Sequence, residues 1–252
     1  MKCVIVLPCY NEEGNVKTLI NTIDRILSPH MPYQIIAVND GSNDYTGDFL
    51  QELSKEYPIR VLEHRTNKGL GVAFRLGLSE AVECSSDGDL IVTMDSDNTH
   101  EPRYILDMIR AAKEADIVIG SRYIRGANQL NVPFRRRILS KTVNFLIGGM
   151  AKLPVRDATS GFRCFRASAL KRLRMFLKHK FIESKGFEVS LEILVKTFWC
   201  NSVIKEVPIT LDFNKRKGSS KMQLLPTIKR YIQLLGEMKA WRTELEENGG
   251  SN

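Results

Sequence analysis

Cysteine is scarce in this chain of 252 residues, with five residues scattered along it and no Cys-x-x-Cys pair. An odd, dispersed set of this kind argues against a disulfide framework and a zinc site, and it fits a reducing compartment. Long apolar runs are also missing, because the longest, at about 145–151, is far shorter than the ~20 residues that a spanning helix requires. The apolar residues 4–7 meet Pro8 and Asn11 too early to form the core of a signal peptide. We therefore expect a cytoplasmic protein without a transmembrane segment of its own.

Charge is divided unequally between the two halves of the chain. Residues 1–120 contain 11 Lys and Arg against 19 Asp and Glu, whereas residues 121–252 contain 26 against 10. No carboxylate lies between positions 122 and 142, a stretch with six basic residues, namely Arg122, Arg125, Arg135, Arg136, Arg137 and Lys141. An acidic half suits a metal site, and a basic half suits phosphate groups or an anionic membrane surface. Solvated surface charge is the alternative explanation.

Short β-branched runs alternate with amphipathic helical patterns through the first 120 residues. The predicted strands cover 3–7, 34–39, 59–64, 90–94 and 116–120. The predicted helices between them cover 16–27, 45–57, 71–82 and 104–115. A repeated β-α-β order with continuously apolar strands predicts an α/β fold, with a doubly wound, mostly parallel sheet and helices on both faces.

The alternation weakens after Gly120, where a helical and basic C-terminal extension is expected. The predicted elements are a basic loop to about 133, helices at 134–152, 168–178 and 187–199, a short element at 161–166, a strand at 203–210 and a polar loop at 211–223. Residues 224–246 predict a final amphipathic helix whose apolar stripe consists of Leu224, Ile228, Tyr231, Leu235, Met238 and Trp241. This stripe fits packing on the core or on a partner, and docking on a membrane surface is the alternative.

Polar motifs follow three of the predicted strands, at the edge where a doubly wound sheet binds its ligands. Asp95-Ser96-Asp97 ends the fourth strand, Asp40 ends the second, and Glu12 follows the first. Two carboxylates one residue apart suit Mg²⁺ or Mn²⁺, with a diphosphate supplying further oxygen ligands. Taken alone, the same residues could instead cap the helix that begins near Pro102. Asp40 and Glu12 can accept hydrogen bonds from a base or a ribose.

The motifs also occur in a characteristic order along the chain. They are Pro8-Cys9-Tyr10-Asn11-Glu12, Asp40-Gly41-Ser42, Asp95-Ser96-Asp97, Gly120-Ser121-Arg122, Asp157-x-x-Ser160-Gly161-Phe162-Arg163 and Gly218-x-Ser220-Lys221. In this order and spacing the chain resembles family 2 glycosyltransferases, and within them the polyprenyl-phosphate hexose synthases, which include dolichol-phosphate mannosyltransferases. The resemblance implies a GT-A fold and inverting transfer of a hexose from a GDP- or UDP-linked donor. The implied acceptor is a polyprenyl phosphate of the dolichyl or undecaprenyl type.

The resemblance also implies a division of the chain. Residues 1–223 would form the GT-A catalytic domain, with a nucleotide and metal half at 1–120 and an acceptor half at 121–223. Residues 224–252 would form the C-terminal amphipathic helix and a tail.

Roles carry over from the family to individual positions of this chain. The residues implied in nucleotide binding are Pro8, Tyr10, Glu12, Asp40 and Asp95. Asp95 and Asp97 would hold Mg²⁺ or Mn²⁺, and the implied catalytic residues are Asp97, Asp157 and Arg122. The residues implied in binding the acceptor or its phosphate are Arg122, Arg136, Arg137, Ser160, Arg163, Lys215, Arg216, Ser220 and Lys221. Two positions depart from the family pattern, because Thr99 stands where members often have a metal-shell Gln and Lys215 where they usually have Arg.

The nature of the acceptor stays open at this point. A lipid phosphate already carries an anionic oxygen, whereas a sugar hydroxyl would need an enzyme base, for which Asp157 is the leading residue. Asp157 can instead have a structural role, such as binding Arg163. Sugar nucleotidyl transfer is disfavoured because the first strand is not followed by a glycine-rich, basic loop. A non-enzymatic protein that binds acidic lipid would leave the acidic motifs at successive strand ends unexplained.

The expected partners follow from this activity. They are a nucleotide-sugar donor, a lipid-phosphate acceptor and the cytosolic face of an anionic membrane, which the protein would contact peripherally. Residues 224–246 could also mediate a homo-oligomer or bind a membrane-protein partner. No nucleic-acid partner is expected, because no nucleic-acid motif is evident.

Overall fold

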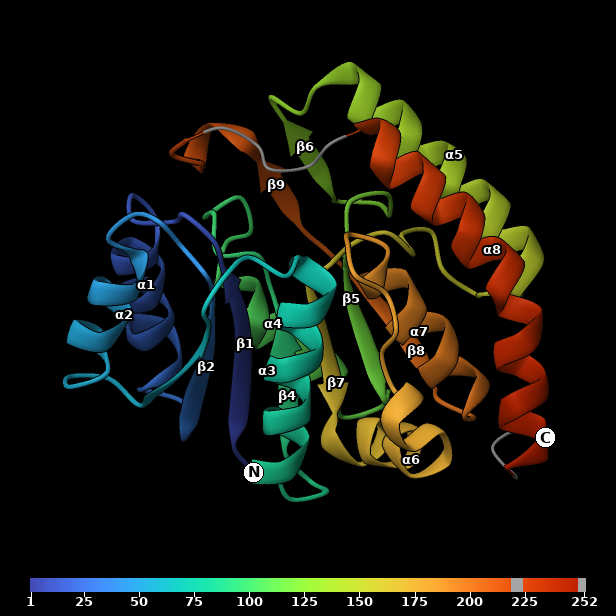
Figure 1. Ribbon diagram of the computed structural model, residues 1–252, viewed down its shortest axis with the longest axis horizontal. Helices are drawn as coiled ribbons and strands as arrows, with labels where there is room; N and C mark the ends of the chain where they lie inside the picture. Colours follow the sequence, from blue (N-terminus) through green and yellow to red (C-terminus); the bar gives the residue numbers. More distant parts are fainter. Residues whose placement is uncertain (219–223, 249–252) are drawn as a thin grey trace.

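The computed structural model describes residues 1–218 and 224–248, apart from the side chains of His179 and Leu224. These residues fold around a seven-stranded sheet of order β3-β2-β1-β4-β7-β5-β8 (Figure 1). Its strands are β1 (Cys3–Cys9), β2 (Tyr33–Asp40), β3 (Ile59–His64), β4 (Leu90–Thr93), β5 (Ile117–Ser121), β7 (Arg163–Arg166) and β8 (Ile204–Pro208). All neighbours are parallel except β7, which runs antiparallel between β4 and β5. The predicted mostly parallel α/β sheet is confirmed.

Helices cover both faces of this sheet, as the sequence predicts (Figure 1). The helices are α1 (Val16–Leu27), α2 (Thr46–Leu53), α3 (Leu70–Cys84), α4 (Tyr104–Ala111), α5 (Phe134–Ala151), α6 (Ala167–Leu177), α7 (Val189–Trp199) and α8 (Leu224–Glu247). Two short 3-10 helices, η1 (Lys178–Lys180) and η2 (Phe213–Lys215), lie in the second half.

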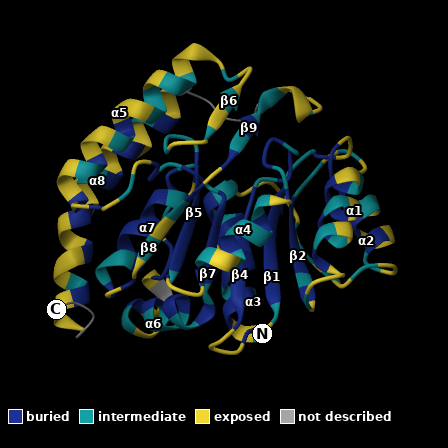
Figure 2. Cartoon of the chain, turned by 180° about the vertical axis from the view of Figure 1, so that it is seen from behind, coloured by how far each residue is buried: buried dark blue, intermediate teal, exposed yellow. Residues whose placement is uncertain are grey.

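The core consists of one apolar layer on each side of the sheet. On β1, Val4 and Val6 face the cluster that contains the buried sides of α3, α6 and α7. Ile5 and Leu7 face the opposite cluster with α1 and α4, which explains why the whole strand is buried (Figure 2). Gly77 lets α3 approach closely, because a Cβ atom there would lie 2.6 Å from Cγ1 of Val6. Tight packing of this kind fixes the strand ends that carry the polar motifs.

The second half adds a small parallel sheet of β6 (Asn128–Leu130) and β9 (Thr210–Asp212). The sequence predicts a loop at β6 and at residues 211–212 of β9, while it assigns Thr210 to the preceding strand, because strands of three residues have little periodicity to detect. Leu211 is nevertheless only 4% exposed, and its burial fixes the start of the basic segment that follows. This segment lies across the carboxyl ends of the large sheet.

Helix α8 lies alongside α5 at the outer side of the sheet (Figure 1). Its residues that join the core are Tyr231, Leu234, Met238, Trp241 and Leu245. Of the apolar stripe predicted for this helix, Tyr231, Met238 and Trp241 therefore pack in the core of the same chain, and Leu235 packs against it. Among the described residues, no helix is both long and apolar enough to cross a membrane.

Candidate active site

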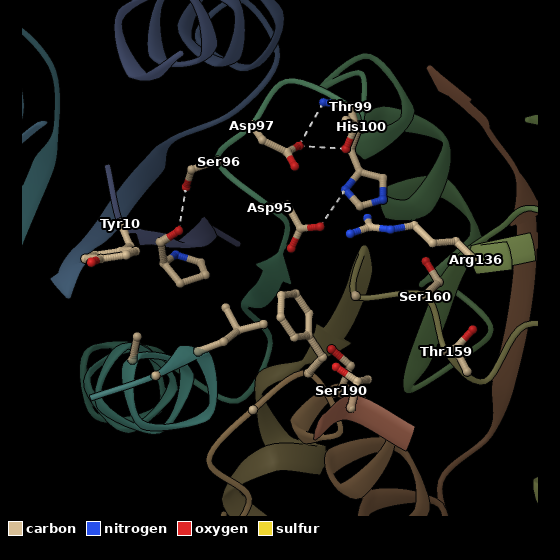
Figure 3. A pocket seen from close by; sticks show the side chains of 18 of the residues that line it. Tyr10, Asp95, Ser96, Asp97, Thr99, His100, Arg136, Thr159, Ser160 and Ser190 are labelled. Carbon is tan, nitrogen blue, oxygen red and sulfur yellow. Dashed lines mark hydrogen bonds and ion pairs between the residues drawn. The ribbon is translucent and has the colours of Figure 1, made fainter. Parts of the chain in front are cut away.

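A cleft of about 730 Å³ opens at the carboxyl ends of β1, β2 and β4. It brings together ten of the residues that the sequence singles out, namely Pro8, Tyr10, Glu12, Asp40, Asp95, Asp97, Arg122, Arg136, Ser160 and Arg216. Their backbones lie up to two hundred residues apart in sequence, so only the fold can assemble them. The cleft has one acidic side and one basic side, and Figure 3 shows Asp95 and Asp97 facing Arg136 across it.

The two aspartates of the motif differ in their surroundings. The Asp97 side chain is 4% exposed, and its Oδ1 accepts hydrogen bonds from the backbone N–H of Thr99 at 3.0 Å and from its hydroxyl at 2.6 Å. Its Oδ2 pairs with Arg216. The Asp95 side chain is 36% exposed, and its Oδ2 lies 3.9 Å from Nδ1 of His100. Thr99, the departure from the family pattern, therefore orients Asp97 in this protein.

The carboxylate pair suits a cation that arrives with a diphosphate. No cluster of three or more His, Cys, Asp or Glu side chains able to hold a metal occurs in the part of the chain that the structure describes. Mg²⁺ and comparable ions are commonly held by one or two carboxylates together with phosphate oxygens and water, so a larger cage is unnecessary. Asp95 and Asp97 both line the cleft and fit this mode of binding.

His100 also lines the cleft, although no sequence motif singles it out. Burial, together with the positive charge of Arg122, lowers the pKa of His100 to about 3. The ring packs against Phe162 with a centroid distance of 5.1 Å, and its Nδ1 has no hydrogen-bond partner. At neutral pH the imidazole beside Asp95 is therefore uncharged.

Asp40 uses both carboxylate oxygens within the fold. Its Oδ1 accepts a hydrogen bond from the backbone N–H of Lys68 at 3.0 Å and lies 2.6 Å from Nδ1 of His64. Its Oδ2 accepts from the N–H of Gly69 at 2.8 Å, and the φ of 95° at Gly69 turns the chain into α3. Asp40 therefore fixes the loop on one side of the cleft, and its contact with a nucleotide stays a prediction.

Asp157 is fully buried and is engaged by Arg122. Its Oδ2 accepts hydrogen bonds from the backbone N–H and from Nε of Arg122, each at 2.8 Å, and its Oδ1 accepts from Nη2 at 2.6 Å. Burial by itself raises the pKa of Asp157, but the charge and hydrogen bonds of Arg122 outweigh it and hold the pKa below its ordinary value. Asp157 thus stays ionised and does not line the cleft.

Arg122 extends this network into the cleft. Its Nη2 also donates to the hydroxyl of Thr159 at 2.7 Å and to that of Ser140 at 3.3 Å. Asp157 raises the pKa of Arg122 against the opposing effect of burial, so the guanidinium remains charged. The hydrogen bonds hold this cation at a fixed place in the cleft wall.

Four of the predicted phosphate-binding residues make other contacts. Arg163 is 1% exposed and donates to the backbone carbonyls of Ala158 and Ser190. Arg137 donates to the carbonyl of Gln129, and Lys215 pairs with Glu101. Ser160 does line the cleft, but its hydroxyl donates to the carbonyl of Gly120 at 2.7 Å.

Ser220 and Lys221, the last two predicted phosphate ligands, lie outside the described residues.

The cleft also contains residues that sequence patterns did not assign to it. They are Asn67, Lys68, Ser140, Lys185, Phe187, Arg230 and Tyr231, among others. Arg230 and Tyr231 come from α8, so this helix contributes directly to the cleft wall. The apolar stripe predicted the burial of Tyr231, but nothing in the stripe indicates which cavity it borders. The boundary drawn at residue 223 stays a prediction.

Solved structures show which fold the chain adopts. Glucosyl-3-phosphoglycerate synthase from Mycobacterium tuberculosis, crystallised with Mn²⁺, UDP and glucosyl-3-phosphoglycerate, gives a TM-score of 0.63 at 17% identity, covering 100% of this chain and 81% of that chain. TarS residues 1–349 from S. aureus, crystallised with UDP-GlcNAc, gives a TM-score of 0.63 at 19% identity, covering 94% and 66%. At these identities the likeness shows the fold alone, and that fold is the GT-A fold of glycosyltransferases. The model of glycosyl transferase family 2 matches residues 4–174, and the chain belongs to this family.

Characterised relatives are similar over most of the chain. A dolichol-phosphate mannosyltransferase from Pyrococcus furiosus is 35% identical over 251 residues, which cover 98% of this chain and 66% of the relative. An undecaprenyl-phosphate mannosyltransferase from Micrococcus luteus is 32% identical over 223 residues, covering 88% of each. A polyprenol monophosphomannose synthase from Mycolicibacterium smegmatis is 32% identical over 225 residues, covering 88% of this chain and 81% of the relative. The chain thus spans slightly less than two thirds of the Pyrococcus protein and most of the other two.

Proposed function

We propose that this protein transfers a hexose, with inversion, from a GDP- or UDP-linked donor to a polyprenyl phosphate. The names of the three relatives support a lipid-phosphate acceptor and favour mannose as the sugar. The observation that carries the proposal is the pairing of Asp157 with Arg122, which removes the leading base and leaves a fixed cation in the cleft. A phosphate acceptor needs a cation of this kind and needs no base.

The acidic side of the cleft is the proposed donor site. Asp95 and Asp97 would hold Mg²⁺ or Mn²⁺, which would act as a Lewis acid for the departing diphosphate. Arg216 pairs with Asp97 and can neutralise phosphate charge on the same side. Pro8, Tyr10 and Glu12 line the adjoining wall, where we expect the nucleoside.

The basic side of the cleft is the proposed acceptor site. Arg136 lies at the start of α5 with its guanidinium directed toward Asp95 and His100 (Figure 3). Its planar group also lies over the ring of Phe213, 5.5 Å from the centroid. Together with Arg122 and the hydroxyl of Ser140, it would orient the acceptor phosphate for attack on the anomeric carbon. Positioning and charge stabilisation then supply the catalysis.

Helix α5 is the proposed contact with the membrane. Apolar side chains remain exposed along it, namely Phe134, Ile138, Phe145, Leu146 and Met150. The neighbouring surface carries the basic residues Arg135 and Lys141, both exposed or partly exposed. Because Arg136 of the same helix lines the cleft, a membrane against α5 would present a lipid phosphate near the proposed acceptor site. The contact would be peripheral and would favour anionic lipid.

A comparison of acceptors tests the proposed function. The protein would be incubated with GDP- and UDP-hexoses and Mn²⁺, with either a short-chain polyprenyl phosphate in detergent or free sugars as acceptor. We expect turnover with the polyprenyl phosphate and a requirement for the metal. Turnover only on sugar hydroxyls would overturn the proposal in favour of the second candidate, a glycosyltransferase that acts on glycans.

A further inference from the structure

Asn15 connects three loops of the cleft through one side-chain amide. It directly precedes α1 and is 1% exposed, yet its side chain makes no capping hydrogen bond to that helix. Its Nδ2 donates instead to Oε2 of Glu12 at 2.6 Å and to the backbone carbonyl of Lys217 at 2.9 Å. Its Oδ1 accepts from the N–H of Lys217 at 3.1 Å and from Nδ2 of Asn98 at 3.2 Å. Both donor hydrogens and the acceptor oxygen are thus used.

The pair of hydrogen bonds to Lys217 fixes the backbone of the basic segment 215–218. Both backbone groups of one residue are bound by one amide, so the segment is held in position and in orientation. The contact is close, because a Cβ atom on Gly14 would lie 3.3 Å from Cβ of Lys217. Asn15 and Lys217 lie 202 positions apart in sequence, so their contact joins the first motif of the chain to one of the last.

The bound segment places Arg216 in the cleft. Arg216 directly precedes Lys217, pairs with Oδ2 of Asp97 and lies over the ring of Phe213, 5.3 Å from its centroid. Asn98, the third partner of Asn15, belongs to the loop that follows Asp97. The amide of Asn15 therefore holds both the segment that carries Arg216 and the loop that follows Asp97.

We propose that Asn15 is a positioning residue for the transfer reaction, which holds Arg216 beside Asp97 so that its guanidinium can meet the charge of the donor diphosphate. This inference takes the identity of the donor, a nucleotide diphosphate sugar, from the proposed function. The contact between Asn15 and the segment 215–218 does not depend on that function. Asn15 acts through Arg216. Asn15 itself does not line the cleft.

Substitution of Asn15 by Asp tests the amide with little change in shape. In Asn15→Asp an oxygen replaces the Nδ2 donor and faces two further oxygens, on Glu12 and on the backbone of Lys217. We expect the segment to be released, so that trypsin cleaves within residues 215–217 about tenfold faster, because a buried hydrogen bond to the backbone of Lys217 is replaced by a repulsive contact between two oxygens. Mass spectrometry of the fragments would separate cleavage there from cleavage at other sites. The Michaelis constant for the nucleotide sugar should rise, while that for the acceptor stays unchanged.

Lys217→Arg is the matched control, because Asn15 contacts only the backbone of Lys217 and the variant keeps a trypsin site at this position. We expect this variant to be cleaved within residues 215–217 at the rate of the wild type. Gly218→Ala is a second perturbation that leaves the buried amide intact. The φ of 94° at Gly218 disfavours a side chain while nothing lies near it, so this variant should also release the segment.

The outcomes separate the inference from the proposed function. Faster cleavage confined to residues 215–217 in Asn15→Asp supports the positioning role whether or not a substrate has been found, and the same pattern in Gly218→Ala shows that this cleavage reports release of the segment. Wild-type cleavage in both variants, or an equal increase at all sites, would overturn it. If Asn15→Asp fails to fold, Asn15→Ala, which removes the amide without adding a charge, decides the question by the same measurement. A released segment with no polyprenyl-phosphate turnover in the wild type would refute the proposed function alone.

Discussion

Asp157 receives three hydrogen bonds from Arg122, two from the guanidinium and one from the backbone N–H. Replacement of Asp157 by Asn should therefore affect stability as well as activity, because it leaves the buried end of Arg122 without its counter-charge. Breaking a buried ion pair by removing one partner typically costs about 3–5 kcal/mol. Urea unfolding and initial rates would be measured together. A large loss of activity at unchanged stability would contradict the positioning role and favour Asp157 as a base.

The carboxylate pair should be required for the proposed metal-dependent reaction. We expect Asp95→Asn and Asp97→Asn each to reduce turnover roughly a hundredfold or more, as the loss of one charge-stabilising group in an active site commonly does. Electron paramagnetic resonance of Mn²⁺ with a nucleotide diphosphate would measure the bound ion directly. Asp107→Asn is the control, because Asp107 pairs with Arg110 on the surface of α4. Undiminished Mn²⁺ binding in both site variants would refute the assignment.

Nucleotide binding should identify the donor base. A ligand present at a hundred times its dissociation constant adds about 2.7 kcal/mol to the free energy of unfolding. We expect one of GDP and UDP to raise the melting temperature in the presence of Mn²⁺ and to lose most of this effect when EDTA is added. Equal shifts with and without the ion would indicate that the carboxylate pair does not take part in nucleotide binding.

His100 should make the protein less stable in mild acid. Burial lowers its pKa in the folded protein to about 3, whereas the unfolded chain takes up a proton near pH 6.5. A histidine whose pKa is lower in the folded protein does not affect stability above its pKa in the unfolded chain. It reduces stability as the pH falls below that pKa. Between pH 7 and pH 5, the wild type should lose about 2 kcal/mol relative to His100→Phe. Urea titrations of both proteins at the two pH values would measure the difference, and parallel losses would contradict it.

The exposed side of α5 should determine binding to anionic lipid. Phe145 is 82% exposed, and Phe145→Asp introduces a charge that both the apolar phase and the anionic headgroups repel. Sedimentation with vesicles containing anionic phosphatidylglycerol should show weaker binding. Met175→Asp is the matched control, since Met175 is 65% exposed but lies on α6. Equal loss of binding in the two variants would mean that charge alone, without α5, governs the interaction.

The first half of the fold was largely predictable because its information is local. The predicted strand at 59–64 coincides with β3, and that at 34–39 lies within β2. Apolar runs and helical spacing are properties of neighbouring residues, and the β-α-β order leaves few alternative topologies. The predicted helix at 45–57 continues past the end of α2, where residues 54–57 form turns before Pro58.

The second half depends on contacts that no local pattern records. The insertion of β7 between β4 and β5, antiparallel to both, is decided by hydrogen bonds between distant segments. The side chains of the cleft are also brought together by contacts between distant segments. Strand-end motifs predicted the acidic side of the cleft, whereas the partner of Asp157 and the place of Arg216 depend on side-chain packing in three dimensions. Arg163 and Arg137 have the right charge but are turned into the protein.

The contribution of α8 to the cleft has a consequence for the order of events during synthesis. The strands that carry the acidic motifs are complete once β4 has been made, whereas Arg230 and Tyr231 follow more than a hundred residues later. Until that helix leaves the ribosome, the growing chain has the carboxylate-bearing edge of the sheet but an unfinished wall beside Arg122. The cleft is therefore complete only after α8 has been translated.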